Sequence, residues 1–176
     1  KGGLGPVALM HVFLGFRRIG PLQYCAGVKK ALRQAGFAAY EPTVNPLQTT
    51  EYRAYQWFYG RPPAGGSLET AARIVRPDKG ARSGPHLAEI YLKHRKPLSL
   101  ISHSQGCIDA RLLLAPEGLG DWKPFDHPDF PAELRGLRIR DCVGSLATVS
   151  APHNGLRYAE EAVDELTILK TMVHPR

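Results

Sequence analysis

The stretch "LISHSQGCIDA", residues 100–110, decides how the rest of this sequence is interpreted. An apolar run over 98–101 predicts a short strand, and apolar residues at helical spacing over 107–114 predict a helix. Ser104 lies between them in the run Ser102-His103-Ser104-Gln105-Gly106. A serine at a tight strand-to-helix turn, flanked by small residues, is typical of the nucleophile elbow G-x-S-x-G. The second glycine of that pattern is present here, and a serine replaces the first.

Two interpretations of Ser104 follow from this stretch alone. In the first, the serine is a nucleophile that the sharp turn exposes at the end of a strand. In the second, its hydroxyl only caps the helix that follows, because serine is a favourable N-cap residue. The two interpretations predict different backbone conformations and different hydrogen bonds for Ser104.

Apolar patterning along the chain predicts strands that alternate with helices. The expected strands are 6–11, 37–40, 98–101 and 142–149, and the expected helices are 24–35, 68–75, 86–94, 107–114 and 156–173. Gly36 stands where a glycine commonly ends a helix. The alternation predicts an α/β fold with a mostly parallel sheet and helices on both faces. Ser104 would then lie at the carboxyl end of a strand, where the sites of open α/β sheets are found.

The composition of the 176 residues is that of a globular protein, and we expect one domain over residues 1–176. No apolar run approaches the roughly 20 residues that a membrane helix needs, and we find no secretory cleavage pattern. The net charge is +7, but the basic residues are scattered, so we expect a solvated surface and no nucleic-acid partner. Three separated cysteines without a C-x-x-C pair, Cys25, Cys107 and Cys142, exclude a zinc ribbon and are expected to be small buried residues.

Three segments together resemble the bacterial true lipases (triacylglycerol lipases) of the α/β-hydrolase superfamily. "HVFLGF" with the helix and strand after it (residues 11–44) resembles their opening segment, which contains an HG-[LF]-x-GF oxyanion loop. Residues 100–107 resemble their G-H-S-x-G-G elbow, and "VGSLATVSAPHNG" (residues 143–155) resembles the strand and "GAPHxG" segment that follow. The resemblance covers residues 6–156 and is weak over 60–84 and 115–135. Three family glycines are replaced, by Val12, Ser102 and Cys107.

The resemblance implies a role for five residues. Ser104 would be the nucleophile, and the backbone N–H groups of Gln105 and Phe13 would form the oxyanion hole. His11 would support the oxyanion loop, and Gly15 would let it turn. Backbone donors of this kind stabilise the negative charge that develops on the carbonyl oxygen when an ester is attacked.

A serine nucleophile needs a base and an orienting acid, in the chain order Ser…Asp/Glu…His. The family places both beyond the last segment that this chain shares with it, and no residue here matches them. Asp164 and His174 are the candidates that the chain offers, although both lie on or near an expected helix. His103, next to the nucleophile, should point away from it, and we interpret His153 as structural. We therefore expect an α/β-hydrolase fold that is incomplete at its C-terminus, with 156–176 resembling the start of a lid region.

The resemblance implies a carboxylic ester hydrolase, a lipase or esterase, that acts through an acyl-serine intermediate on a lipid or ester substrate. It also implies secretion, transient contact with a lipid surface, and a structural calcium whose ligands would lie outside this chain. We identify no cofactor and no metal site. The missing acid and base leave an alternative open, a non-catalytic α/β-hydrolase-like protein that binds lipid or another anion.

Overall fold

A four-stranded parallel sheet organises the computed structural model, which describes residues 4–11, 18–19, 22–23, 25–44, 49–60, 85–126 and 130–153. Its strand order is β4-β1-β5-β6, and every neighbouring pair is parallel. The strands are β1 (Val7–Met10), β4 (Ala39–Tyr40), β5 (Leu98–His103) and β6 (Val143–Val149). A separate antiparallel pair, β2 (Arg18–Ile19) with β3 (Leu22–Gln23), was not predicted from the sequence.

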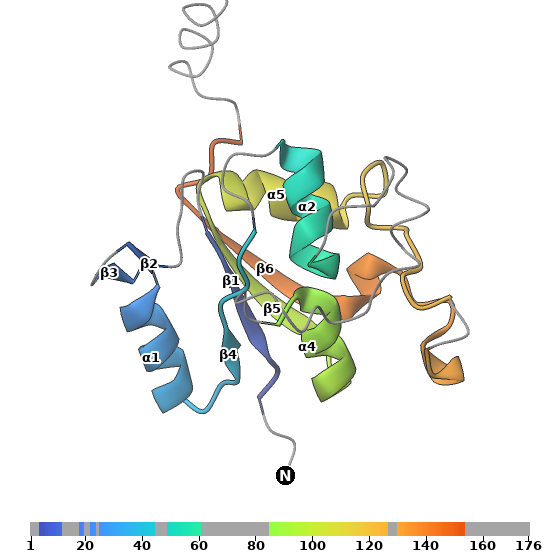
Figure 1. Ribbon diagram of the computed structural model, residues 1–176, viewed down its shortest axis with the longest axis horizontal. Coiled ribbons are helices and arrows are strands. Elements are labelled where there is room, and N and C mark those ends of the chain that lie inside the picture. Colours follow the sequence, from blue (N-terminus) through green and yellow to red (C-terminus); the bar gives the residue numbers. More distant parts are fainter. Residues whose placement is uncertain are drawn as a thin grey trace, which may run out of the picture.

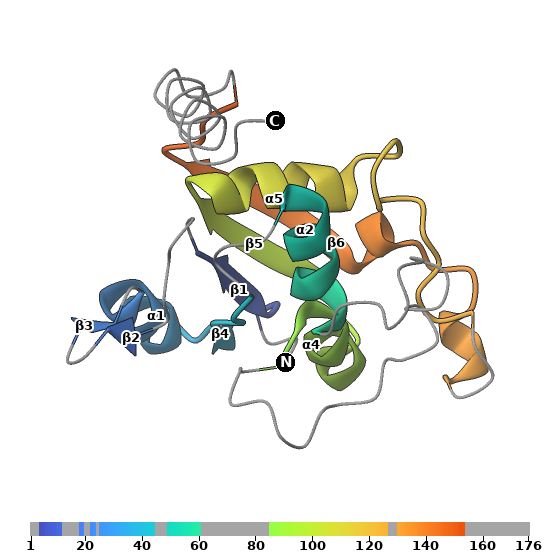
Figure 2. The ribbon, with the colours of Figure 1, turned by 45° about the horizontal axis from the view of Figure 1, so that its top comes forward.

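Helices lie on both sides of this sheet. The described helices are α1 (Ala26–Gln34), α2 (Thr50–Tyr59), α4 (Leu87–His94) and α5 (Gln105–Leu114), with 3₁₀ turns η1 (Ala132–Leu134) and η2 (Ile139–Cys142). Helices α2, α4 and α5 gather on one side, and α1 lies on the other (Figures 1 and 2). The predicted α/β architecture is therefore confirmed. The helices expected over 68–75 and 156–173 fall outside the described residues. Within the described ranges, no helix has the length and apolar character that a membrane crossing requires.

The central strands show why the sheet can be covered on one side by three helices. In β5, buried residues alternate with partly exposed ones, so Leu98, Leu100 and Ser102 share the buried face. In the parallel register Ala8 of β1 pairs with Leu100, and Met10 pairs with Ser102. These two neighbouring strands therefore present one continuous buried surface to the helices, and their carboxyl ends lie side by side.

Helix α2 was not predicted, although its ends carry ordinary signals. The Thr49 side chain caps it by accepting a hydrogen bond from the backbone N–H of Tyr52 at 3.3 Å. Gly60 follows its last residue at φ 84°, a conformation that favours glycine. The apolar pattern is interrupted because Arg53 lies on the buried face among aromatic residues. A charged residue at a core position hid the helix from an argument based on hydrophobic periodicity.

The segment after α5, where the resemblance is weak, also contributes to the core. Phe125 is fully buried and stacks on Tyr91 of α4, with 5.8 Å between the ring centroids. Its ring also meets Phe130 edge-on at 5.3 Å and lies 6.4 Å from Phe58 of α2. This irregular segment is thus held against α2 and α4 by one aromatic anchor.

We predict that Phe125→Ala lowers the free energy of unfolding by about 3–5 kcal/mol, because it leaves a cavity among three aromatic rings. Urea denaturation followed by circular dichroism measures this. The control is Leu4→Ala, since Leu4 is 53% exposed and its loss should change stability by less than about 0.5 kcal/mol. Equal effects of the two substitutions would show that Phe125 does not anchor the segment.

Candidate active site

Ser104 alone connects β5 to α5, because the strand ends at His103 and the helix begins at Gln105. Its backbone has φ 53° and ψ −124°, a combination that residues with a Cβ rarely adopt. Such a conformation costs about 1–3 kcal/mol and persists only where the surrounding structure imposes it. The turn thus has the sharp, strained geometry of a nucleophile elbow.

The helix-cap interpretation of Ser104 is wrong. A capping serine has an extended backbone, and its hydroxyl accepts a hydrogen bond from an N–H group in the first turn. Ser104 has a positive φ, and its side chain makes no capping hydrogen bond. Helix capping therefore does not explain the strained backbone conformation of Ser104.

Two hydrogen bonds from the turn converge on the end of the neighbouring strand β6. The backbone N–H of Ser104 donates to the Val149 carbonyl oxygen at 3.0 Å, and the Cys107 thiol lies 3.6 Å from the same oxygen. The N–H of Cys107 donates in turn to the Ser104 carbonyl oxygen at 3.0 Å. Cys107, which replaces a family glycine, is therefore a fully buried residue that ties the turn to β6.

Gly106 is required by the close approach of α5 to the end of β1. A Cβ on this residue would lie 2.8 Å from the His11 carbonyl oxygen and 3.0 Å from that of Met10. Both atoms belong to the backbone and cannot rotate away. Ser102, which replaces the other elbow glycine, is fully buried, and its hydroxyl donates to the Met10 sulfur at 3.4 Å.

His11 follows β1 directly and is buried beside the elbow, with 2% of its surface exposed. Its Nε2 accepts a hydrogen bond from the Val44 N–H at 3.3 Å, and its ring meets the Trp57 ring edge-on at 4.9 Å. Its carbonyl oxygen accepts a hydrogen bond from Arg53 Nη2 at 3.2 Å. The side chain and the backbone of His11 are thus both held in place.

A buried ion pair next to the elbow was missed by the sequence analysis. Arg53 Nε donates to Asp109 Oδ2 at 2.9 Å, and both side chains are fully buried. Trp57 Nε1 donates to the same oxygen at 2.9 Å, while Oδ1 is buried without a hydrogen-bonding partner. Burial raises the pKa of Asp109 to about 6, although Arg53 and the Trp57 N–H both lower it. Asp109 is engaged by these two donors and is not placed as the acid of a catalytic triad.

The cysteines offer no second nucleophile. All three are free thiols. Cys107 and Cys142 are buried as expected, whereas the expectation of burial is wrong for Cys25, which is partly exposed. Burial raises the pKa of all three thiols, to about 11 for Cys25 and to about 12 for Cys142. The reactive thiolate form is therefore disfavoured at each position.

Comparisons with known proteins identify relatives of this architecture. No protein-family model matches the sequence. The sequence is 29% identical over 150 residues to a triacylglycerol lipase of Pseudomonas fragi, covering 83% of this chain and 43% of that lipase. It is 28% identical over 150 residues to a lipase of Staphylococcus hyicus, covering 81% of this chain and 23% of that protein. The chain is therefore similar in sequence to two bacterial lipases.

Solved structures show the same relationship at the level of the fold. Lipase 1 from Pelosinus fermentans matches with a TM-score of 0.58 and 22% identity over 92% of this chain and 45% of that one. The crystal structure of the Staphylococcus hyicus lipase matches with a TM-score of 0.53 and 24% identity over 96% of this chain and 46% of that one. The chain spans less than half the length of each of these relatives. The resemblance to bacterial lipases and the α/β-hydrolase-like fold are thus confirmed.

Four of the candidate site residues lie outside the described residues: Phe13 and Gly15 of the expected oxyanion loop, and Asp164 and His174, the candidates that the chain offers for the acid and the base. Within the described part of the chain, the Ser104 hydroxyl makes no hydrogen bond to a histidine or a carboxylate.

Besides His11, whose Nε2 accepts the Val44 N–H, two further histidines near the elbow are described. By the alternation along β5, His103 lies on the sheet face opposite to Ser102. His153 is exposed, and its Nδ1 lies 3.4 Å from Arg111 Nη1. Neither histidine forms a hydrogen bond with the Ser104 hydroxyl, so the described residues do not assign a base.

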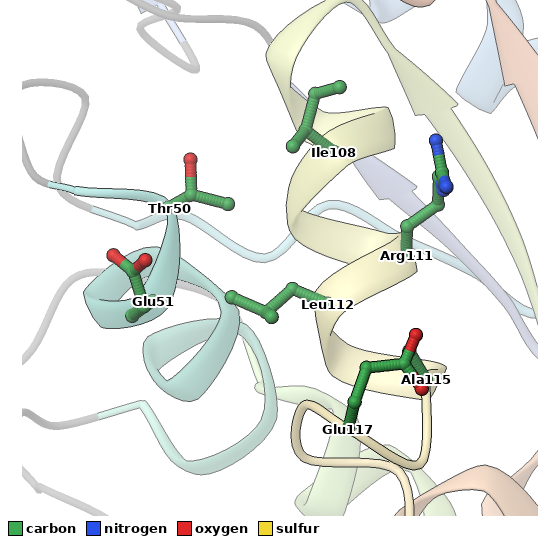
Figure 3. Close-up of a pocket in the computed structure, with 7 residues that line it drawn as sticks. All are labelled: Thr50, Glu51, Ile108, Arg111, Leu112, Ala115 and Glu117. Atoms are coloured by element: carbon green, nitrogen blue, oxygen red, sulfur yellow. The ribbon is translucent and has the colours of Figure 1, made fainter. Parts of the chain in front are cut away.

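A pocket of about 410 Å³ lies between the first turn of α2 and the outer side of α5 (Figure 3). Leu112 extends from α5 towards α2 in this view, and Ile108 lies one turn after Ser104 on the same helix. The pocket is lined by Thr50, Glu51, Ile108, Arg111, Leu112, Ala115 and Glu117. Because Ser104 does not line it, this pocket is not assigned to the reacting ester.

The described residues contain no group of three or more His, Cys, Asp or Glu side chains that could hold a metal ion. They therefore assign no ligand to the structural calcium that the lipase resemblance implies.

The strain at Ser104 predicts an unusual order of stability. Ser104→Gly should be more stable to urea than Ser104→Ala by about 1 kcal/mol, because glycine adopts a positive φ without a steric penalty whereas alanine keeps the Cβ. At Ser145, which lies in β6 without a positive φ, the order should be reversed. The same order at both positions would contradict the strained turn.

The contact at Gly106 predicts a loss of stability from a single added methyl group. Gly106→Ala should lower the free energy of unfolding by about 1–3 kcal/mol, because the Cβ would push α5 away from the end of β1. The control is Gly27→Ala in α1, where nothing lies within 4 Å of the added Cβ and a gain of about 0.5–1 kcal/mol is expected. Thermal or urea unfolding of both variants checks the contrast, and a stable Gly106→Ala variant would refute it.

Proposed function

We propose that this protein is a carboxylic ester hydrolase, a lipase or esterase, in which Ser104 is the nucleophile. The observation that carries the proposal is the backbone of Ser104, with φ 53° and no capping hydrogen bond, at the carboxyl end of a central parallel strand. A strained serine in this position projects its hydroxyl above the sheet edge, where substrates of α/β proteins bind. The sequence similarity to proteins named lipase supports the same chemistry.

In the proposed reaction, Ser104 Oγ attacks the ester carbonyl carbon while a general base accepts the hydroxyl proton. The carbonyl oxygen of the tetrahedral intermediate receives hydrogen bonds from the backbone N–H groups of Gln105 and Phe13, which the lipase resemblance proposes as the oxyanion hole. Gln105 is the first residue of α5, and the first N–H groups of a helix have no partner within the helix. Such preorganised donors contribute several kcal/mol to transition-state stabilisation.

The intermediate then collapses, the bond from the carbonyl carbon to the alcohol oxygen breaks, and the base returns its proton to the departing alcohol. Water, activated by the same base, hydrolyses the acyl-serine to release the carboxylic acid and regenerate the Ser104 hydroxyl. Asp164 and His174 are the candidates within this chain for the acid and the base. His11 and Gly15 have supporting roles in this proposal, since they hold and turn the oxyanion loop.

The proposed substrates are lipids or other carboxylic esters, met in transient contact with a lipid surface. Secretion and a structural calcium are part of the same proposal, and both come from the lipase resemblance alone. A thioesterase or acyltransferase would use the same elbow, because the acyl-serine step is common to all three reactions.

The net charge of +7 favours one alternative, a non-catalytic protein that binds anionic lipid. Salt-sensitive binding to phosphatidylglycerol vesicles without ester turnover would favour this alternative over a hydrolase.

We predict that a fluorophosphonate probe labels the full-length protein at Ser104 and abolishes hydrolysis of a p-nitrophenyl ester. Ser104→Ala should remove both the labelling and at least about 1,000-fold of kcat, because the nucleophile is lost. The control is Ser145→Ala in β6, which removes a hydroxyl that donates to the Ser99 hydroxyl at 2.9 Å. This variant should be labelled at Ser104 like the wild type. Peptide mass spectrometry locates the label. Ester turnover that survives in Ser104→Ala would refute the assignment.

A further inference from the structure

We propose that Arg53 is a positioning residue that fixes the end of β1, where the oxyanion loop begins, against the helix that carries Ser104. This inference rests on the proposed function, because it assigns Arg53 a part in the same ester hydrolysis. It concerns a residue to which the resemblance gave no role, on a helix that the sequence analysis did not predict.

The Arg53 guanidinium connects two elements that meet at the elbow. Its Nε donates to Asp109 Oδ2 at 2.9 Å, and Asp109 lies on α5, five residues after Ser104. Its Nη2 donates to the His11 carbonyl oxygen at 3.2 Å, at the residue that follows β1. A single rigid side chain from α2 therefore joins the helix of the nucleophile to the end of the strand beside it.

The first turn of α5 also limits where the His11 carbonyl oxygen can lie. A Cβ on Gly106 would lie 2.8 Å from its oxygen, so the first turn of α5 already packs against this carbonyl. Arg53 supplies a directed attraction to the same oxygen, and Gly106 sets how closely the helix approaches. Together they define the position of His11 relative to Ser104.

Arginine suits this task better than lysine. Its guanidinium is planar and presents several N–H donors in a fixed geometry, so one group can bond a carboxylate and a carbonyl in set directions. A buried ion pair is weak evidence for stability, because the cost of removing both charges from water offsets much of their attraction. The geometry therefore points to positioning as the consequence of this pair, in addition to any contribution to stability.

The expected effect of Arg53 on the reaction rate follows from the short separation of His11 and Phe13 in the sequence. Phe13, whose N–H is proposed for the oxyanion hole, is two residues after His11. A displacement of about 1 Å at a reacting centre can reduce the rate about 100-fold. A shift of His11 should therefore weaken transition-state stabilisation more than it weakens the binding of the ester substrate.

The test compares Arg53→Lys with Leu113→Ala in the full-length protein. Arg53→Lys keeps the positive charge but loses the planar set of N–H donors that bonds both Asp109 and His11. We therefore expect kcat for a soluble p-nitrophenyl ester to fall about 10- to 100-fold, with KM changed less than about 3-fold. Leu113 is a fully buried residue of α5, one turn after Asp109, and its apolar side chain makes no hydrogen bond. Its truncation should lower the melting temperature but change kcat of the folded protein less than about 2-fold.

Asp109→Asn carries the test if Arg53→Lys does not fold, because it keeps the shape and one acceptor oxygen for Arg53. We expect a smaller fall in kcat, about 3- to 10-fold, again with little change in KM. Where both variants fold, the double variant should lose little more than Arg53→Lys alone, because the two residues act through one link. A kcat that changes no more than in Leu113→Ala would overturn the positioning role.

Labelling by the fluorophosphonate separates this inference from the proposed function. If the wild type is labelled at Ser104 and Arg53→Lys reacts at the same rate, only the positioning role fails. If the wild type is not labelled at Ser104, the proposed function fails and the positioning role fails with it. Slower labelling of Arg53→Lys than of Leu113→Ala, at equal folded fraction, supports the proposal.

Discussion

The close approach of α5 to the end of β1 is the constraint on which the rest of the site depends. At Gly106 the helix backbone lies so near the His11 carbonyl that no side chain fits between them. The approach places the first turn of the helix beside the neighbouring strand end and leaves only Ser104 to reverse the chain direction. The positive φ of Ser104 is a consequence of that short connection, and the strain is held by hydrogen bonds to β6.

The buried polar groups near the elbow surround the contact between α5 and the end of β1. Arg53 and Trp57 of α2 form a hydrogen-bonded group with Asp109 of α5, and His11 joins it through its carbonyl oxygen and its ring. Buried charges are tolerated only when they are paired and hydrogen-bonded, which explains why Arg53 can occupy the core side of α2. The apolar core surrounds this group and includes the aromatic anchor Phe125.

The similarity to bacterial lipases agrees with this arrangement, but it extends over less than half of each relative's length. In this chain the sheet order is β4-β1-β5-β6, and the turn at Ser104 follows β5. The proposed hydrolase activity depends in addition on an acid and a base that the described residues do not provide. The role of the turn at Ser104 and the identity of the residues that would activate its hydroxyl are therefore separate questions, and different experiments address them.

The sequence by itself determined the α/β class, the strands that flank the elbow and the position of Ser104, because hydrophobic periodicity and the small residues around a tight turn are local signals. It did not reveal α2, since Arg53 interrupts its apolar face, or the link from Arg53 through Asp109 to His11, since those residues are far apart in the chain. Residues 100–110 alone left Ser104 equally open to a capping role, and only the lipase resemblance favoured a nucleophile. Only the tertiary structure excluded the capping role, because the backbone angles of Ser104 depend on how closely α5 packs against β1 and β6.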